Sequence, residues 1–435
     1  MKVTPLEDWI IDKSGIKEKK PELLAEYQLN KLRETLYYVK KNSRFYGERL
    51  GSIDEDKINS FNDFKNIPFT YPYHIRQNPL NFLCMPQGEI TRIVTIKSSG
   101  TSGAEKRIYF SEQDLNLTID FFKVGMSCLT DKNDRVMVLL PGESFGSIGD
   151  LLKKALEMSN VECINHGVVV DPEKTAKSIM ENDITCIVGI PMQVLNLSRL
   201  KRDVFKSRIK KVLLSTDYVP DVLIHELTHQ YGCKVFAHYG MTEMGYGGGV
   251  ECGALDGYHM READLYLEVV NPDTGEAVPD GQSGEVVFTT LTRKAMPFIR
   301  YRTGDIASFA SNPCACGTFL KTMKKVLGRI ANKVLIGENQ FLYLRELDET
   351  ILKFKEVLDY QAYIADENLL RVEIQSDNPS ISMKNDIEQS VQTLLYQNLG
   401  YEMKLDVITN PDSNPEKITN SMVKRKIGDF RGAGI

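Results

Sequence analysis

A run of glycine and hydroxyl residues, Lys97-Ser-Ser-Gly-Thr-Ser-Gly-Ala-Glu-Lys106, has a composition suited to binding phosphate. Apolar β-forming residues flank it, which predicts a polar loop between two strands. Its glycines allow close backbone approach, and its N–H groups, hydroxyls and ammonium can surround a polyphosphate. A Walker sequence is absent, so a solvated hairpin loop remains the alternative for this stretch alone. The candidate phosphate-binding residues are Ser98, Ser99, Gly100, Thr101, Ser102, Gly103 and Lys106.

The pentapeptide His225-Glu226-Leu-Thr-His229 matches the zinc-protease pattern of two histidines and a glutamate base. The metzincin form of that pattern has a third ligand downstream, and here no histidine or glutamate follows at that spacing. We prefer the interpretation that this pentapeptide forms the exposed face of a short helix between two strands. A zinc peptidase remains the alternative from a different class.

Cys252, His259, Cys314 and Cys316 offer three soft sulfurs and one imidazole. This donor set is typical of a closed, tetrahedral structural zinc site. In the Cys314-Ala-Cys316-Gly317 piece, the glycine lets backbone N–H groups turn toward the sulfurs. Free thiols with a surface histidine are the alternative, and a catalytic zinc is not expected because no coordination position would stay open.

These side chains need a scaffold of alternating strands and helices. Buried runs alternate with helical segments, which predicts an α/β fold with parallel sheets. Ligands in such folds gather at the carboxyl ends of strands, where Ser215-Thr-Asp217 and His238-Tyr-Gly240 lie. From residue 264 to 309 the pattern predicts a small β-barrel-like or antiparallel layer. We expect a large N-terminal domain, residues 1–328, and a smaller mobile α+β lid domain, residues 329–435.

Composition limits the class of protein. The 435 residues are 42% hydrophobic and 26% charged, as in ordinary globular proteins, and carry a net charge of -5. Nucleic-acid and anionic-membrane partners are not expected, because their binding surfaces would be basic. The sequence lacks an apolar run of roughly twenty residues and a signal-peptide core, so we expect a cytoplasmic protein. A homodimer is the ordinary expectation for its assembly.

Four pieces of the sequence occur in an order that resembles the adenylate-forming superfamily of acyl-CoA synthetases, adenylation domains and luciferases. The similarity is greatest to phenylacetate-CoA ligases and the coenzyme F390 synthetase-like proteins, and it covers essentially the whole chain. Each motif alone is weak, but their common order is specific. The pieces are the 98–106 loop, His238-Tyr-Gly-Met-Thr-Glu243, Tyr301-Arg-Thr-Gly-Asp305 and Gly328-Arg329.

The resemblance implies a role for each matching residue. Glu243 would bind Mg²⁺, which prefers carboxylate oxygen, and Thr242 would contact the α-phosphate. The adenine would lie on Tyr239, and Asp305 would accept hydrogen bonds from the ribose hydroxyls. The rest of the implied nucleotide site is Ser215, Asp217, His238, Gly240, Met241 and Arg329.

The C-terminal region departs from the family pattern. The lysine that contacts the carboxylate and α-phosphate usually follows a Ser-x-Gly sequence, whereas this chain has Ser421-Met-Val-Lys424-Arg-Lys426. We assign the role to Lys424, with Lys426 as the alternative, and a solvated basic helix face remains open for both. Ala331 occupies the hinge position, where Asp or Lys is usual.

The implied activity is an ATP-dependent, AMP-forming ligase that activates an aryl acid such as phenylacetate and transfers the acyl group to coenzyme A. ATP or AMP, Mg²⁺, coenzyme A and a structural Zn²⁺ are the expected bound groups. A carrier-protein thiol could replace coenzyme A as the acceptor. A non-catalytic nucleotide sensor is a further alternative.

Overall fold

The structure, a computed structural model, describes residues 2–96, 105–337, 340–400, 403–409 and 425–431. The chain folds into two compact units, each built from separate stretches of sequence. Unit 1 comprises Met1–Asn133, Pro141–Glu162 and Phe236–Val326, and unit 2 comprises Asp134–Leu140, Cys163–Val235 and Leu327–Ile435. The chain leaves unit 1 for the last time at Val326, close to the predicted boundary at residue 328, which stays a prediction.

The helices of unit 1 begin at residues suited to that position. Proline is the first residue of α1 (Pro5–Ser14) and α2 (Pro21–Asn42), where a missing N–H costs nothing. Ser111 and Asp114 form a reciprocal capping box at the start of α6 (Glu112–Met126), as their spacing predicts. The other α-helices in the described part of this unit are α3 (Arg44–Leu50), α4 (Phe61–Phe64), α5 (Pro72–Gln77) and α7 (Ile148–Glu157), and its 3-10 turns are η1 (Glu55–Lys57), η2 (Pro79–Phe82), η3 (Gln87–Glu89) and η4 (Thr242–Met244).

Helix α1 is tied to a distant part of unit 1. The buried Glu7 carboxylate accepts hydrogen bonds from Thr318 Oγ1 at 2.6 Å and from the Phe319 N–H at 3.2 Å. Lys19 also pairs with Glu7, at 2.7 Å. The first helix therefore contacts residues from the last part of this unit.

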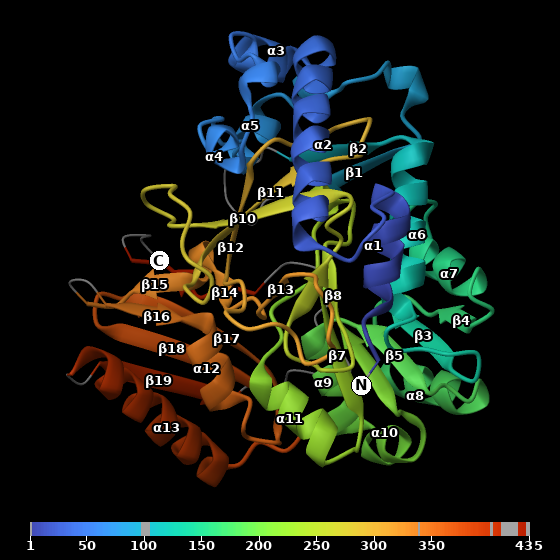
Figure 1. Ribbon diagram of the computed structural model, residues 1–435. Helices are drawn as coiled ribbons and strands as arrows, with labels where there is room; N and C mark the ends of the chain where they lie inside the picture. The colour runs from blue at the N-terminus through green and yellow to red at the C-terminus, as the bar shows by residue number, and fades with distance from the viewer. Residues whose placement is uncertain (1, 97–104, 338–339, 401–402, 410–424, 432–435) are drawn as a thin grey trace. The chain divides into compact units, whose positions relative to one another are not determined.

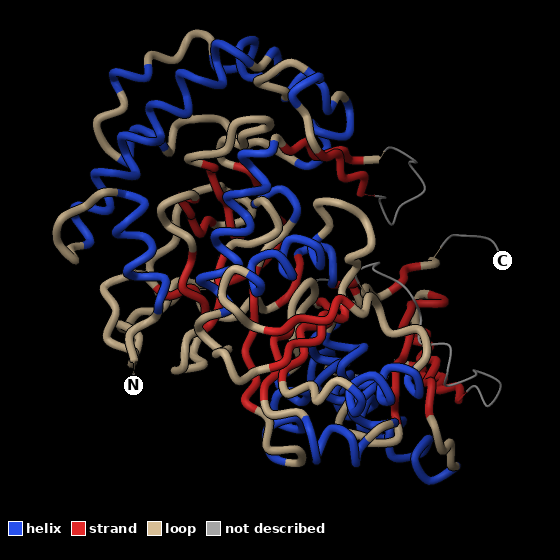
Figure 2. The backbone as a smooth tube through the Cα atoms, turned by 90° about the vertical axis from the view of Figure 1, so that its right-hand side faces the viewer, coloured by secondary structure: helices blue, strands red, loops and turns tan. Residues whose placement is uncertain are grey.

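The strands of unit 1 are antiparallel. β1 (Arg92–Ile96) pairs with β2 (Lys106–Phe110) as a two-stranded ribbon (Figure 2). β10 (Leu265–Val270), β11 (Gly284–Thr290) and β12 (Tyr301–Ala307) pair in that order, which is the predicted antiparallel layer. A further set consists of β7 (Lys234–Tyr239), which enters the unit at Phe236, with β8 (Gly249–Glu251), β9 (Tyr258–Met260) and β13 (Thr322–Met323).

Unit 2 contains the predicted parallel sheet. Its buried strands β3 (Arg135–Leu139), β5 (Cys186–Gly189) and β6 (Lys211–Leu214) are parallel neighbours. Short buried strands joined by helices are typical of such sheets. The connecting helices are α8 (Pro172–Glu181), α9 (Pro191–Leu200), α10 (Arg202–Arg208) and α11 (Asp221–His229), and β4 (Glu162–Asn165) precedes them.

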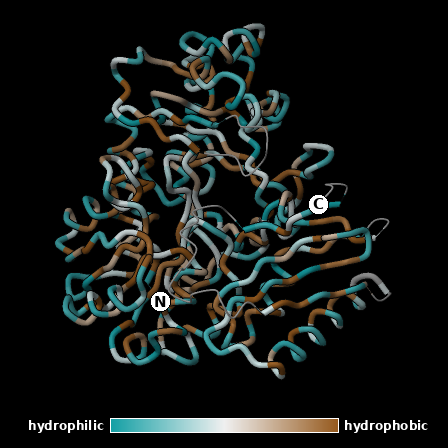
Figure 3. Tube along the Cα trace, turned by 180° about the vertical axis from the view of Figure 1, so that it is seen from behind, coloured by the Kyte–Doolittle hydropathy of each residue, from teal (hydrophilic) through white to brown (hydrophobic). Residues whose placement is uncertain are grey.

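The C-terminal part of unit 2 is a second sheet with two helices. Its strand order is β19 (Lys404–Thr409), β18 (Leu369–Ser376), β17 (Val357–Asp366) and β20 (Gly428–Asp429). Helices α12 (Leu344–Ile351) and α13 (Ile381–Leu399) lie together beside this sheet (Figure 1). Apolar and polar residues alternate along α13 (Figure 3), as expected for a helix with one buried face. The short elements before this sheet are β14 (Gly328–Arg329), η5 (Ile330–Asn332), β15 (Lys333–Leu335) and β16 (Phe341–Tyr343).

Candidate active site

Glu243 lies in the short 3-10 turn η4, directly after strand β7. The chain reverses tightly here, and Gly245 adopts the left-handed conformation with φ 77°. A side chain at Gly240 would place its Cβ 2.3 Å from the carbonyl oxygen of Tyr246, so only glycine fits. The compact turn fixes the backbone that carries Glu243.

The Glu243 carboxylate contacts two donors that come from other strands. Lys106, the first residue of β2, forms an ion pair with Glu243 Oε1. The Tyr301 hydroxyl, at the start of β12, donates to the same oxygen at 2.9 Å. Lys106 Nζ also donates to the Tyr301 hydroxyl oxygen at 3.3 Å. Three motifs distant in sequence therefore meet around one carboxylate oxygen.

The surroundings of Glu243 keep it ionised although it is buried. Burial by itself raises the pKa of this carboxyl, but the charge of Lys106 and the hydrogen bonds from Lys106 and Tyr301 outweigh that effect and lower the pKa to about 2. A buried carboxylate that stays negative near neutral pH is suited to binding a cation.

Arg293 fixes the backbone on both sides of this cluster. Its guanidinium donates to the carbonyl oxygen of Glu243 at 2.6 Å and to that of Tyr109, in β2, at 3.0 Å. The side chain is buried, and its guanidinium carbon lies 4.4 Å from the centroid of the Phe110 ring. The sequence motifs assign no role to Arg293 or to Tyr301. Tyr301 belongs to the Tyr301-Arg-Thr-Gly-Asp305 motif, which is a signal for it, whereas no local pattern distinguishes Arg293.

Tyr239 and Asp305 form a second buried pair. The hydroxyl of Tyr239, the last residue of β7, donates to Asp305 Oδ2 at 3.0 Å. Gly304 precedes Asp305 with φ 75°, a conformation that favours glycine, and its N–H donates to Glu285 Oε1 at 2.9 Å. The structure thus brings together the predicted adenine-contacting and ribose-contacting residues.

The other predicted site residues divide into three groups. Thr242, Met241, Gly240 and His238 are in unit 1 on the same β7–η4 segment as Glu243. Ser215 and Asp217 follow β6 in unit 2, and Arg329 ends β14 in unit 2. Residues 98–103 and Lys424 lie outside the described residues, so their assignments stay predictions. The alternative lysine, Lys426, is described and exposed.

The four predicted metal ligands form a cluster in unit 1. One ligand atom from each of Cys252, His259, Cys314 and Cys316 lies within 4.8 Å of all the others. The Cys252 and Cys314 sulfurs are 3.7 Å apart, and Cys316 Sγ is 3.6 Å from His259 Nε2. A tetrahedral zinc with Zn–S near 2.3 Å and Zn–N near 2.05 Å requires about 3.8 Å between sulfurs and about 3.6 Å from sulfur to nitrogen. These two separations therefore fit zinc, and the other donor atoms lie within 4.8 Å of one another.

The backbone around the cluster also suits thiolates. The Ala254 N–H donates to Cys252 Sγ at 3.4 Å, and the Cys316 N–H donates to Cys314 Sγ at 3.5 Å. Gly317 adopts φ 84°, as expected for the turn that follows the second cysteine. Donors directed at sulfur stabilise its negative form.

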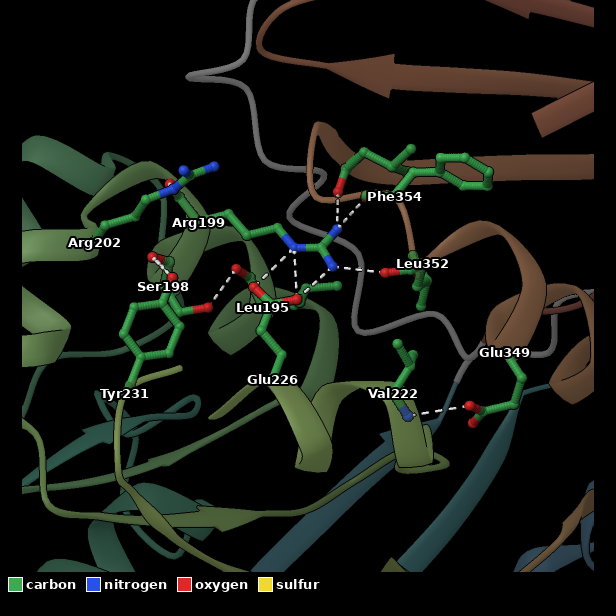
Figure 4. A network of polar contacts seen from close by, with 11 residues as sticks. Leu195, Ser198, Arg199, Arg202, Val222, Glu226, Tyr231, Glu349, Leu352 and Phe354 are labelled. Atoms are coloured by element: carbon green, nitrogen blue, oxygen red, sulfur yellow. Dashed lines mark hydrogen bonds and ion pairs between the residues drawn. The ribbon is translucent and has the colours of Figure 1, made fainter. Parts of the chain in front are cut away.

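The protease-like pentapeptide lies on helix α11 in unit 2. Its glutamate, Glu226, is buried and accepts from Arg199 at 2.6 Å, with further contacts from the same guanidinium to both carboxylate oxygens (Figure 4). His225 and His229 are exposed. Because Arg199 occupies both oxygens of Glu226, this carboxylate is not available as a general base, and the pentapeptide is not retained as a catalytic motif.

Comparison with known proteins gives a family match for part of the chain and a fold match for most of it. Residues 91–291 match the family described as AMP-binding enzyme. A solved structure of 2-hydroxyisobutyryl-CoA ligase with a bound acyl-AMP has a TM-score of 0.81 at 19% identity, over 94% of this chain and 90% of that one. The predicted resemblance to the adenylate-forming enzymes is confirmed by the family match of residues 91–291 and by the shared mixed α/β fold.

Curated proteins with similar sequences include two phenylacetate-coenzyme A ligases. The phenylacetate-coenzyme A ligase of Pseudomonas putida is 27% identical over 364 residues, 81% of each chain. The enzyme of the same name from Thermus thermophilus is 26% identical over 429 residues, 95% of this chain and 92% of the relative. Among the helices in the described ranges, none is long and apolar enough to cross a bilayer.

Proposed function

We propose that this chain is an ATP-dependent, AMP-forming ligase that activates a carboxylic acid and transfers the acyl group to coenzyme A. The observation that carries the proposal is the buried, ionised Glu243 carboxylate, joined to Lys106 and Tyr301. Lys106 and Glu243 both lie within residues 91–291, the region that matches AMP-binding enzymes. The names of the curated relatives support an aryl acid of the phenylacetate type as the substrate.

The reaction proceeds in two displacements. A carboxylate oxygen of the acid attacks the α-phosphorus of ATP, the bond to the β-phosphate breaks, and pyrophosphate leaves. The coenzyme A sulfur then attacks the carbonyl carbon of the acyl-adenylate, and AMP leaves. Negative charge develops on phosphate oxygens in the first step, where fixed donors and cations stabilise it most. We assign Lys106 and the 98–103 loop to the β- and γ-phosphates and Thr242 to the α-phosphate.

The nucleoside would be held by residues near the ends of β7 and β12. Tyr239 supplies the aromatic face for adenine, and Asp305 accepts hydrogen bonds from the ribose hydroxyls. The hydrogen bond between the Tyr239 hydroxyl and Asp305 keeps these two side chains in fixed relation. His238, Gly240, Met241, Ser215, Asp217 and Arg329 complete the proposed nucleotide site.

Glu243 is the proposed Mg²⁺ ligand. Its carboxylate is the hard oxygen donor that Mg²⁺ prefers, and its low pKa keeps it unprotonated at any pH near neutral. When bound with ATP, this ion supplies positive charge against the phosphates. The chain's contribution is the rigid η4 turn, which fixes the backbone that carries this carboxylate.

A structural Zn²⁺ is proposed for Cys252, His259, Cys314 and Cys316. Support comes from the donor set and from separations that agree with tetrahedral coordination. All four positions would be filled by protein atoms, so the ion would stabilise the loops after β8 and β12 and take no part in the reaction.

The C-terminal residues would serve both half-reactions. We propose residues 329–435 as a lid domain whose Lys424 contacts the acid and the α-phosphate, with Lys426 as the alternative. Lids of this kind exclude water from the reaction and complete the site. In this proposal, Ala331 stands at the hinge about which the lid domain turns.

Pyrophosphate release tests the function. Wild-type protein with ATP and Mg²⁺ is assayed against a panel of aryl and short-chain acids, with and without coenzyme A. We expect release that depends on an aryl acid, and an acyl-CoA product when coenzyme A is present. Lys424→Ala should lower the rate of release by about a hundredfold or more, as expected for a positioned catalytic contact, and Lys426→Ala should not.

Each departure from this result has a definite meaning. A larger loss in Lys426→Ala would transfer the catalytic assignment to Lys426. Release of pyrophosphate without an acyl-CoA product would favour a carrier-protein thiol as the acceptor. ATP binding with no acid-dependent release for any acid would contradict the ligase and favour a nucleotide sensor.

A further inference from the structure

The hydroxyl of Tyr301 lies between the two charged residues of the candidate active site. It donates to Glu243 Oε1 at 2.9 Å and accepts from Lys106 Nζ at 3.3 Å. Tyr301 is 1% exposed, and the Glu243 side chain is 5% exposed. A hydrogen bond to a buried charge is worth more than one between neutral groups.

The position of this hydroxyl is fixed by the packing of its ring. The Phe298 and Phe288 rings lie 5.2 Å and 5.3 Å from the ring of Tyr301, centroid to centroid. On the backbone, Tyr301 forms a bridge with Thr70, and the neighbouring Arg302 N–H donates to the Thr70 carbonyl at 2.9 Å. The tyrosine is thus held on the strand by its backbone and by two phenylalanine rings that also pack against each other.

Lys106 differs from Tyr301 in its freedom to move. Its ammonium ends a flexible four-carbon chain and can turn its three donors toward a stronger anion. A triphosphate beside the cluster is such an anion, so the ammonium would divide its attraction between Glu243 and the phosphates. Tyr301 is then the donor that continues to hold the Glu243 carboxylate.

We propose that Tyr301 is a positioning residue that holds the Glu243 carboxylate ready for its divalent cation, while Lys106 is a releasable counter-ion. The inference rests on the proposed function, and it assigns different roles to the two donors that contact Glu243. Tyr301 acts through Glu243, because its hydroxyl contacts the carboxylate oxygen directly.

The test is Tyr301→Phe, which removes the hydroxyl and keeps the ring. The measured quantity is the Mg²⁺ concentration for half-maximal pyrophosphate release at saturating ATP and acid. We expect this concentration to rise about tenfold or more, as expected for one hydrogen bond to a buried charge. The same rise should appear in the direct binding of Mn²⁺ with a non-hydrolysable ATP analogue.

Tyr46→Phe is the matched control. Tyr46 is also 1% exposed in unit 1, and its hydroxyl bonds Thr70 Oγ1 at 3.1 Å and the Ile299 N–H at 3.0 Å. Tyr46→Phe should also lower the melting temperature, because it too removes a buried hydroxyl, but the partners of this hydroxyl are neutral. A purely structural role of Tyr301 predicts equal metal requirements in the two variants.

The outcomes separate this inference from the proposed function. An active wild type whose metal requirement is unchanged by Tyr301→Phe, or is changed equally by Tyr46→Phe, would overturn the inference alone. A wild type that releases no pyrophosphate with any acid would overturn the proposed function, and the inference with it.

Discussion

His238 is a residue through which unit 1 should respond to acid. It lies in β7, beside the Phe121 and Phe122 rings at 6.3 Å and 6.2 Å between centroids. Burial lowers the pKa of its imidazole to about 4, and the nearby Arg261 charge acts in the same direction. The folded protein therefore holds this histidine neutral.

The sign of the resulting pH effect follows from that lowered pKa. A free histidine titrates near pH 6.5, so on acidification the unfolded chain takes up a proton before the folded one does. The contribution of His238 to the free energy of unfolding is complete above about pH 6.5 and is lost as the pH falls toward about 4. Between pH 7.5 and 5, wild type should lose about 2 kcal/mol relative to His238→Gln. Urea unfolding of both proteins across that range measures the difference, and parallel pH profiles would contradict it.

For single residues, the sequence predicted well which side chains come together in the site. It predicted less well which contacts they form. Lys106 and Glu243, and Tyr239 and Asp305, come from separate motifs and form two contacting pairs. The motifs did not reveal that Tyr301 shares the Glu243 oxygen, because a hydroxyl at the start of a strand has no local pattern. Arg293 contacts two backbone carbonyls, which carry no sequence signal at all.

Helices α9 and α11 are joined to the start of β17 by one arginine. Arg199, on α9, donates to the carbonyl oxygens of Leu352 at 2.6 Å and Phe354 at 3.0 Å, and to that of Val357 (Figure 4). Its side chain is 1% exposed, and Glu226 on α11 neutralises it. The guanidinium thus connects three elements of unit 2 through a single planar group.

Replacing Arg199 should therefore weaken unit 2 strongly. Arg199→Met leaves the Glu226 carboxylate and three carbonyl oxygens buried without their donor, and we expect a loss of about 3–5 kcal/mol in the free energy of unfolding. The matched control is Arg208→Met. Arg208 pairs with Asp183 at 2.7 Å on the surface of the same unit, and we expect a loss of at most about 1 kcal/mol. Urea unfolding measures both losses.

A double variant tests whether the unpaired charge of Glu226 causes the loss of stability. Adding Glu226→Gln to Arg199→Met removes the unpaired charge and should restore part of the lost stability. Equal losses for Arg199→Met and Arg208→Met, or no recovery in the double variant, would contradict the role of Arg199 as the central donor.

At the scale of elements, the alternation of buried runs and helical segments predicted the mixed α/β fold with its parallel sheet. The proline-led α2, the capping box of α6 and the parallel strands β3, β5 and β6 all follow local rules. Grouping these elements into units depends on contacts between distant residues, such as Arg199 with Leu352, which periodicity cannot reveal. Glu226 shows the limit of a local pattern. Its pentapeptide suggests catalysis, whereas its ion pair with Arg199 gives it a structural role.

For the molecule as a whole, we expect the Cys₃His cluster to be a main source of stability in unit 1. It joins residues 252–259 to residues 314–316, and a bound zinc would close that long stretch of chain. Purified protein should contain about one zinc per chain, and Cys316→Ser should lose it and melt at a lower temperature. Elemental analysis and thermal unfolding with and without a chelator check this.

Cys84→Ser is the control for the zinc experiment. Cys84 is also a buried thiol of unit 1, but its sulfur donates to the Phe82 carbonyl at 3.8 Å and is not among the clustered ligands. The Cys84→Ser variant should retain the zinc. Zinc content that is unaffected by Cys316→Ser would contradict the assignment.

The contact between Glu7 and the residues after Cys316 has a consequence for the order in which the protein is made. Helix α1 leaves the ribosome well before Thr318, which donates to Glu7 and lies 311 residues later in the chain. At about 5 to 20 residues per second, roughly 15 to 60 seconds of translation separate them. Lys19, the other partner of Glu7, is only 12 residues away and is therefore made long before Thr318. Helix α1 therefore gains its contact with Thr318 only when unit 1 is almost completely synthesised.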